Sequence, residues 1–237
     1  MKKLLLAVVA SLAMLLTSCN KESYYHSLGL VYPTGYQVAY LFADQTFDSL
    51  YFYSTDNTRL SAYNDTWVTI PDSMKNLTIP NYYRTIFYVW VPLTFEPNTT
   101  GKPRSAQVTI QSEGEDKWNQ TTTATYYQLP WHNVYRPAPA FKYEDSTITG
   151  ATFKATLKGE QISDTLEFYA YANWTLSDGT FVHPKVNAGG EGVQKVPLDV
   201  ELNDSQAERT DQIVLTGKGV STPIQFIQEI KKEEIAQ

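Results

Sequence analysis

One phrase of this sequence occurs twice in register, and it constrains the fold more than any other feature. The segment VPLTFEPNTTGKPR covers residues 91–104, and VPLDVELNDSQAER covers residues 196–209, so that each residue lies 105 positions from its partner. Upstream, DSLYFYSTDNTRLS (residues 48–61) aligns with DTLEFYAYANWTLS (residues 164–177) at a spacing of 116. Two copies of about 100 residues predict two domains of ordinary size.

Apolar residues alternate with other residues in both copies. Val91, Leu93 and Phe95 show this period of two, and the second copy repeats it over residues 196–202. A period of two indicates strands of an antiparallel sheet with one buried face. Segments rich in Gly, Pro and Asn separate the strands, and no sustained amphipathic helix occurs after the N-terminal segment. The pattern predicts an all-β fold of two tandem immunoglobulin-like β-sandwich domains.

The predicted organisation has six parts. They are a signal peptide (1–18), an anchor linker (19–27), a first sandwich (28–129), a linker (130–139), a second sandwich (140–231) and a tail (232–237). The prolines of LPWHNVYRPAP, which contains the linker, predict a stiff and extended spacer.

The N-terminal segment has the composition of a secretory signal. Lys2 and Lys3 precede an apolar run over residues 4–16, which is shorter than the roughly 20 residues that span a membrane. Leu-Thr-Ser at residues 16–18 followed by Cys19 resembles the lipobox of bacterial lipoproteins. The resemblance implies cleavage before Cys19, acylation of this cysteine and an outer-membrane location, on the cell surface or the periplasmic face. An ordinary signal peptide with an incidental cysteine is the alternative.

Charge and motif content exclude several classes of function. Removal of Lys2 and Lys3 leaves 17 basic and 25 acidic residues, a net charge of about −8 that argues against nucleic acid as a partner. His26, His132 and His183 are far apart and show no metal-ligand spacing. No nucleotide-binding or hydrolase motif is present. We therefore expect no enzyme activity, metal or cofactor.

Two charged residues recur in the repeated phrase. Glu96 and Arg104 flank a turn in the first copy, and Glu201 and Arg209 flank it in the second. Folded as a hairpin, each copy would bring its two side chains together across adjacent strands. A sugar-contacting role is the alternative, but recurrence at the same turn favours a structural pair because a fold must rebuild its turns in each copy and a binding site need not recur.

Aromatic residues are the remaining functional signal, because sugar rings stack on exposed aromatic side chains. Trp118 lies among charged residues, Trp131 lies in the predicted linker, and Trp174 has only Thr58 as its counterpart in the first copy. These three tryptophans are the predicted ligand-binding residues. Phe87, Tyr88 and Trp90 lie on an alternating strand and are predicted to pack in the core or between domains.

The order of these motifs resembles the BACON modules of Bacteroidota lipoproteins and glycoside hydrolases. The shared features are Asp-x-Leu-x-Phe at a strand start, a Trp in the next segment, Asn-x5-Arg between two strands, and a last strand ending in Gln (Gln128 and Gln228). The resemblance implies small β-sandwiches and leaves two functions open. One is a membrane-anchored glycan-binding accessory protein, with a polysaccharide and other outer-membrane proteins as partners. The other is a structural or adhesive spacer that binds no sugar.

Overall fold

The computed structural model describes residues 26–34, 37–63, 66–80, 85–113 and 119–231. These ranges contain nineteen strands and one short helix, α2 (Asp72–Lys75), which confirms the predicted all-β fold. None of their helical segments is long and apolar enough to cross a membrane. Cys19 and Trp118, two of the predicted site residues, lie outside the described residues.

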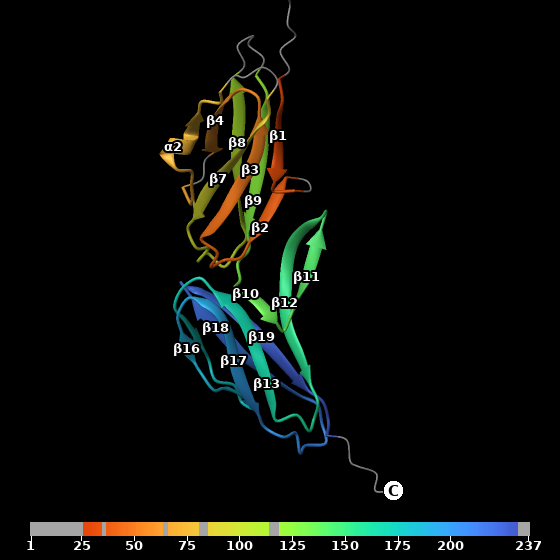
Figure 1. Ribbon diagram of the computed structural model, residues 1–237. Coiled ribbons are helices and arrows are strands. Elements are labelled where there is room, and N and C mark those ends of the chain that lie inside the picture. Colours follow the sequence, from red (N-terminus) through yellow and green to blue (C-terminus); the bar gives the residue numbers. More distant parts are fainter. Residues whose placement is uncertain (1–25, 35–36, 64–65, 81–84, 114–118, 232–237) are drawn as a thin grey trace, which may run out of the picture.

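Two sheets face each other in the N-terminal half of the chain (Figure 1). One has the strand order β1-β3-β7-β5, formed by Leu28–Tyr32, Phe47–Ser54, Phe87–Phe95 and Val68–Thr69. The other has the order β2-β9-β8-β4-β6, formed by Val38–Leu41, Thr121–Gln128, Arg104–Glu113, Asn57–Tyr63 and Asn76–Leu77. β2 joins β9 in parallel, and the remaining neighbours are antiparallel.

The C-terminal half also has two sheets. The first has the order β10-β13-β17-β15, formed by Asn133–Arg136, Ser163–Ala170, Gly192–Val200 and Val182–Pro184. The second has the order β11-β12-β19-β18-β14-β16, formed by Pro139–Glu144, Thr147–Leu157, Val220–Gln228, Arg209–Gly217, Trp174–Leu176 and Ala188–Gly189. Position by position these orders match those of the N-terminal half, with β11 as the one addition.

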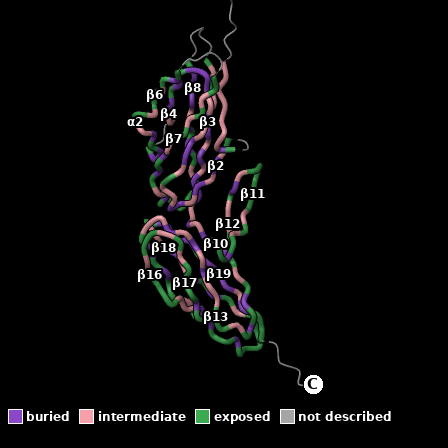
Figure 2. Tube along the Cα trace, viewed as in Figure 1, coloured by how far each residue is buried: buried purple, intermediate pink, exposed green. Residues whose placement is uncertain are grey.

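Each half encloses its own apolar core. Leu50, Phe52 and Val91 are fully buried in the N-terminal half, and Leu166 and Ile213 are fully buried in the C-terminal half. These residues lie at the inward positions of the alternation predicted from the sequence. Figure 2 shows the buried positions running along the strands of both halves. Burial of alternate apolar side chains from two facing sheets holds each pair of sheets together.

The added strand β11 forms an arm with the first part of β12. The two strands pair from Pro139↔Phe153 to Glu144↔Thr147, and the arm rises beside the N-terminal half (Figure 1). At its tip, the Tyr40 hydroxyl donates a hydrogen bond to the Ser146 carbonyl at 3.1 Å. The arm therefore contacts the half to which it does not belong.

The predicted stiff spacer at residues 130–139 is wrong. Residues Asn133–Arg136 form β10, which pairs with β13. The Ala43 amide donates to the Trp131 carbonyl at 2.8 Å, and His132 is 2% exposed. Proline is accepted beside an edge strand such as β10, so that a proline-rich segment can enter a sheet. The two halves thus meet at a short, buried junction.

Candidate ligand-binding surface

The repeated phrase does not form the predicted hairpin. β7 pairs with β3 and β5 in one sheet, whereas β8 pairs with β4 and β9 in the facing sheet. The phrase therefore crosses from one sheet to the other, and the same crossing joins β17 to β18. Period-two alternation identifies a strand but not the strand with which it pairs.

At this crossing three polar residues form what we call the polar corner: Asn98, Arg104 and Gln128. Asn98 is fully buried, and its amide donates to the Lys102 carbonyl at 2.7 Å. Arg104 donates through Nε to Gln128 Oε1 at 2.9 Å and through Nη2 to the Glu96 carbonyl at 2.6 Å. Buried polar groups are stable when hydrogen-bonded in this way, so the polar corner closes the end of the sandwich.

The C-terminal half repeats the polar corner with Asn203, Arg209 and Gln228. Arg209 donates to Gln228 Oε1 at 2.8 Å and to the Glu201 carbonyl at 2.7 Å. Its guanidinium lies 4.2 Å from the centre of the Phe181 ring. In both halves the arginine therefore binds the main-chain carbonyl of the glutamate, which corrects the predicted pairing with its carboxylate.

Trp174 is 4% exposed, so the prediction that its ring lies on the surface is wrong. The ring packs edge-on against Phe168 at 5.0 Å, and its Nε1 donates to the Gly190 carbonyl at 3.1 Å. Alternation explains the error, because Trp174 and Leu176 point inward while the intervening Thr175 is exposed. The counterpart of Trp174, Thr58, whose lack of a ring suggested that the position is not structural, is itself 3% exposed, so the position faces inward in both halves.

Trp131 is half-buried at the junction and packs against the core of the C-terminal half. It lines a cleft of about 570 Å³ between the crossing of the N-terminal half, which contributes Gly101 and Pro103, and the β12 and β19 side of the C-terminal half. The lining includes neutral polar side chains such as Gln212 and Gln225. The cleft is therefore open to neutral polar ligands.

Four aromatic side chains form a surface that we call the aromatic platform: Tyr51 and Tyr53 on β3, and Tyr88 and Trp90 on β7. Tyr51 pairs with Trp90 and Tyr53 with Tyr88 in the strand register, and their ring centres lie 5.3 and 6.0 Å apart. Tyr88 is 61% and Trp90 57% exposed. Tyr53 lies across Gly29 of β1, where a side chain would collide with its ring.

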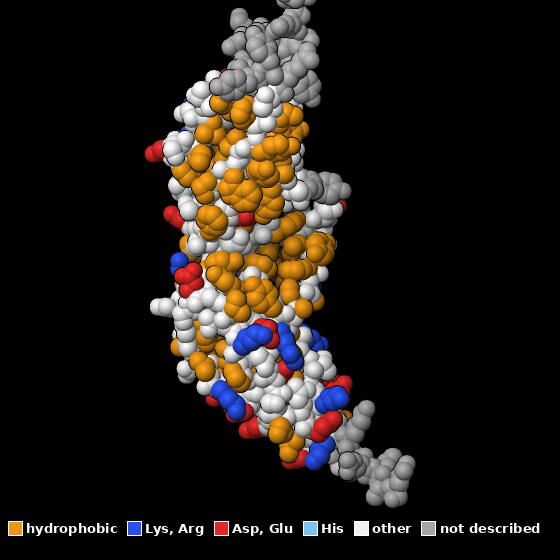
Figure 3. All heavy atoms as spheres, in the orientation of Figure 1, with side chains coloured by type: hydrophobic (Ala, Val, Ile, Leu, Met, Phe, Trp, Pro, Cys, Tyr) orange, Lys and Arg blue, Asp and Glu red, His pale blue; other side chains and the backbone are white. Residues whose placement is uncertain are grey.

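This surface corrects the prediction that Tyr88 and Trp90 pack in the core or between domains, because both are exposed. On β7 the inward positions belong to Val89, Val91 and Leu93, so that the two aromatic residues face solvent. Figure 3 shows hydrophobic side chains gathered on this face of the N-terminal half. The signal was present in the sequence, because Tyr51 alternates with the inward Leu50 and Phe52.

The C-terminal half lacks this surface. Its four corresponding positions, identified by the same strand pairing, are Glu167, Tyr169, Val193 and Lys195. Lys195 Nζ lies 3.4 Å from Glu167 Oε1, where the N-terminal half has the contact between Tyr51 and Trp90. A sandwich of this topology thus forms with an ion pair in place of the two contacting rings, and the platform is not a requirement of the fold.

The junction below the platform contains two buried ionisable groups. Asp44 is 3% exposed, and burial raises the pKa of its carboxyl to about 7, although the nearby backbone amides of Asp44 and Asn133 act in the opposite direction. Burial lowers the pKa of His132 to about 4, and its Nδ1 lies 2.9 Å from Thr222 Oγ1. Both groups favour their neutral forms, as expected for poorly solvated side chains.

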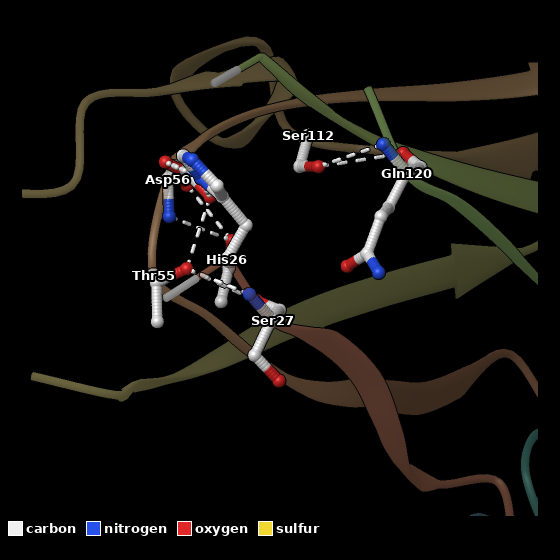
Figure 4. A network of polar contacts seen from close by, with 7 residues as sticks. His26, Ser27, Thr55, Asp56, Ser112 and Gln120 are labelled. Atoms are coloured by element: carbon white, nitrogen blue, oxygen red, sulfur yellow. Dashed lines mark hydrogen bonds and ion pairs between the residues drawn. The ribbon is translucent and has the colours of Figure 1, made fainter. Parts of the chain in front are cut away.

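The other end of the N-terminal half has a polar network (Figure 4). His26 Nδ1 lies 2.9 Å from the Asp56 carboxylate, and Thr55 Oγ1 donates to Asp56 at 2.9 Å. The Ser27 amide in turn donates to Thr55 Oγ1 at 2.9 Å. The network fixes the start of β1 to the turn between β3 and β4, at the end of the half away from the junction (Figure 1).

Residues 56–123 match the family model of BACON, described as "Putative binding domain, N-terminal". The match contains Tyr88 and Trp90 and ends before the C-terminal half. No curated protein sequence gives a significant match. The N-terminal half thus carries a segment that is similar to a binding module.

The solved structures that match this chain include two glycoside hydrolases and a chimeric titin. A Bacteroides ovatus GH5 xyloglucanase in complex with a XXXG heptasaccharide is 24% identical, with a TM-score of 0.31, over 33% of this chain and 17% of that one. A chimeric titin Z1Z2 is 10% identical, with a TM-score of 0.30, over 88% and 98% of the two chains. An endo-fucoidan hydrolase of glycoside hydrolase family 107 is 10% identical, with a TM-score of 0.27, over 82% of this chain and 27% of that one. At these TM-scores the similarities identify no function.

Proposed function

We propose that this protein is a non-catalytic, membrane-anchored carbohydrate-binding protein, and that the aromatic platform stacks against the sugar rings of a polysaccharide. One observation carries the proposal: the platform has four aromatic residues in one half of the chain, while the corresponding positions of the other half hold an ion pair, a valine and a single aromatic residue, Tyr169. Exposed apolar rings that the fold does not require point to a ligand.

Stacking supplies the binding energy in this proposal. Tyr and Trp present flat apolar faces together with a polar group, which suits a ligand whose C–H faces alternate with hydroxyls. Each stacked ring contributes about 1 kcal/mol, so that four rings on one surface support a measurable affinity for a polymer. The match of residues 56–123 to a binding-domain model is consistent with this role.

The anchor completes the proposal. The lipobox at Cys19 would attach the chain to the outer membrane, on the cell surface or the periplasmic face. β1 begins at the end of the N-terminal half that lies away from the junction (Figure 1), so that the C-terminal half would extend away from the membrane. A Cys19→Ser variant should lose acyl labelling and leave the membrane fraction. Retention of both would contradict anchoring.

Affinity electrophoresis through gels that contain plant or host polysaccharides tests the carbohydrate-binding proposal. We expect Trp90→Ala and Tyr88→Ala each to weaken retardation about fivefold, the equivalent of 1 kcal/mol. The matched control is Lys195→Ala, at the position that corresponds to Trp90, which should leave retardation unchanged. Equal effects of all three variants would contradict the proposal.

A spacer or adhesive module is the second candidate function, because an exposed apolar surface also suits a protein partner. If no polysaccharide retards the intact protein and Trp90→Ala instead disrupts capture of another outer-membrane protein, this second function replaces the first.

A further inference from the structure

A second group of aromatic side chains lies on the corresponding sheet of the C-terminal half. We call it the tyrosine cluster: Tyr135 on β10, Tyr169 on β13 and Tyr171 just after β13. The rings of Tyr169 and Tyr171 lie 4.5 Å apart, and Tyr135 is 48% exposed. The Asn133 side-chain amide donates to the Tyr135 hydroxyl at 3.4 Å, and Asn133 is the strand partner of Tyr169, which brings β10 and β13 together at the cluster.

The tyrosine cluster follows the aromatic platform along the strand direction. On β3, the 55% exposed Phe47 lies six residues from Tyr53, a distance of about 20 Å along an extended strand. The chain before Phe47 reaches Ala43, whose amide donates a hydrogen bond at 2.8 Å to the carbonyl of Trp131, two residues before β10. The route from the platform to the cluster thus runs through Phe47 and the junction. Figure 3 shows hydrophobic side chains over β3 and β7 and again at the junction end of the C-terminal half.

Charged residues begin where the tyrosine cluster ends. Farther along β13, Glu167 pairs with Lys195 at 3.4 Å and Asp164 pairs with Arg136 at 2.8 Å. Figure 3 shows basic and acidic side chains gathered on this part of the C-terminal half, beyond the junction. The aromatic residues themselves offer no cation for an anionic ligand, and the net charge of −6 would repel one. The surface therefore matches an uncharged ligand.

The shape of the surface indicates whether the protein binds the end of a polysaccharide or an internal stretch of it. Recognition of a chain end or a short sugar favours a concave pocket that encloses the ligand. Tyr88 and Trp90 instead project from the face of a sheet and are more than half exposed, which leaves both ends of a stacked chain free to continue.

We propose that one uncharged polysaccharide chain lies along the strands and contacts both the aromatic platform and the tyrosine cluster, so that the protein binds internal stretches of long chains. This inference rests on the proposed function and adds the ligand's charge, its minimum length and the participation of the second half. The platform provides the main contact, and the tyrosine cluster provides affinity that only a long chain can gain.

Titration calorimetry on the full mature chain tests the inference, with hydroxyethyl cellulose, glucomannan and arabinoxylan and with size-fractionated oligosaccharides of each as probes. Affinity for at least one of them should rise with chain length. Tyr169→Ala and Tyr135→Ala should each weaken binding of the long chains about fivefold and leave the short oligosaccharides unaffected. Trp90→Ala should weaken both. Carboxymethyl cellulose, an anionic counterpart of hydroxyethyl cellulose, should bind less well than the latter.

The controls distinguish failure of this inference from failure of the proposed function. Ile162→Ala, at a 63% exposed apolar residue after the turn before β13, should change nothing. Because Tyr169 is half-buried, its variant is interpreted only if the melting temperature is retained, and the more exposed Tyr135 provides the independent test. If Trp90→Ala weakens binding but Tyr135→Ala does not, or if affinity is independent of length, the extended site is wrong and the platform remains. If no variant changes binding, both proposals fail.

Discussion

The outer faces of the two halves differ although their strands correspond one by one. At the positions where β3 and β7 place Tyr51 opposite Trp90, β13 and β17 place Glu167 opposite Lys195. The rings of the first pair contact each other in a tilted arrangement with centres 5.3 Å apart, and the second is an exposed ion pair at 3.4 Å. An exposed ion pair contributes at most about 1 kcal/mol to folding, so the fold tolerates different residues at these outer positions. Folding stability therefore does not explain why the N-terminal half has aromatic residues there.

The polar corners at the ends of the two sandwiches, in contrast, are the same in both halves. Gln128 and Gln228 accept a hydrogen bond from an arginine in the same geometry, at 2.9 and 2.8 Å. Asn98 and Asn203 occupy equivalent, fully buried positions. Features that both halves keep therefore belong to the fold, and features that one half alone displays are candidates for function.

Trp174 gives the strongest test of this rule, because it is present in one half but buried. Trp174→Ala should lower the free energy of unfolding by about 3–5 kcal/mol through loss of the buried ring. Trp90→Ala, on the exposed face, should change it by less than about 1 kcal/mol. Thermal and denaturant unfolding measure both. A stable Trp174→Ala protein would show that the ring is dispensable to packing.

The polar corner should matter equally in both halves. Gln128→Leu and Gln228→Leu each leave an arginine and several carbonyls without a buried partner, and each should cost about 3 kcal/mol. Hydrogen exchange would place each loss in its own half. Gln212→Leu, at an exposed strand position, is the control. A difference of more than about 1 kcal/mol between the two variants would contradict the equivalence of the corners.

Two equivalent turns, one at the junction and one at the free end of the C-terminal half, differ in how far they are buried. Asp44 is covered by the C-terminal half, whereas Glu160, in the corresponding turn at the free end, is exposed. Because burial raises the pKa of Asp44 from 3.8 to about 7, the folded protein holds this proton more tightly than the unfolded chain, and stability contributed by Asp44 is lost as pH rises from about 4 to 7. Asp44→Asn should therefore gain stability relative to the wild type, on the order of 2 kcal/mol more at pH 7.5 than at pH 5.

Titration of His132 changes the folding stability with pH in the opposite direction to Asp44. The stability of Asp44→Asn is therefore compared with that of the wild type at the same pH, because both proteins contain His132. Burial lowers the pKa of His132 from 6.5 to about 4, and the stability it contributes is lost as pH falls from about 6.5 to 4. The control Glu160→Gln should show no comparable pH-dependent gain. If it matched Asp44→Asn, burial at the junction would not be the cause.

Much of the fold followed from local pattern. Alternation correctly placed Leu50, Val91 and Leu198 inside, because a strand with one buried face leaves a period of two in its own sequence. Alternation could not show that β7 and β8 lie in different sheets, since the pairing depends on contacts between strands far apart in the chain. The glutamate and arginine pairs were therefore assigned to a hairpin that does not exist.

The candidate site was harder to predict. Tyr51 and Trp90 meet only through strand register, 39 residues apart in sequence. Trp174 misled because the lack of a ring at its counterpart Thr58 was taken to show that the position is not structural, whereas Thr58 is itself buried. Applying the alternation rule to aromatic as well as aliphatic residues would have placed Tyr51 and Trp90 outside and Trp174 inside.

Exchange of the outer pair tests the central claim most directly. A double variant, Tyr51→Glu with Trp90→Lys, gives the N-terminal half the ion pair that the C-terminal half already has. Measured by calorimetry against the polysaccharide that the wild-type protein binds, the double variant should lose about 30-fold in affinity, the equivalent of two stacked rings, with a nearly unchanged melting temperature. Unchanged affinity, or a variant that no longer folds, would contradict the assignment of the aromatic platform to binding.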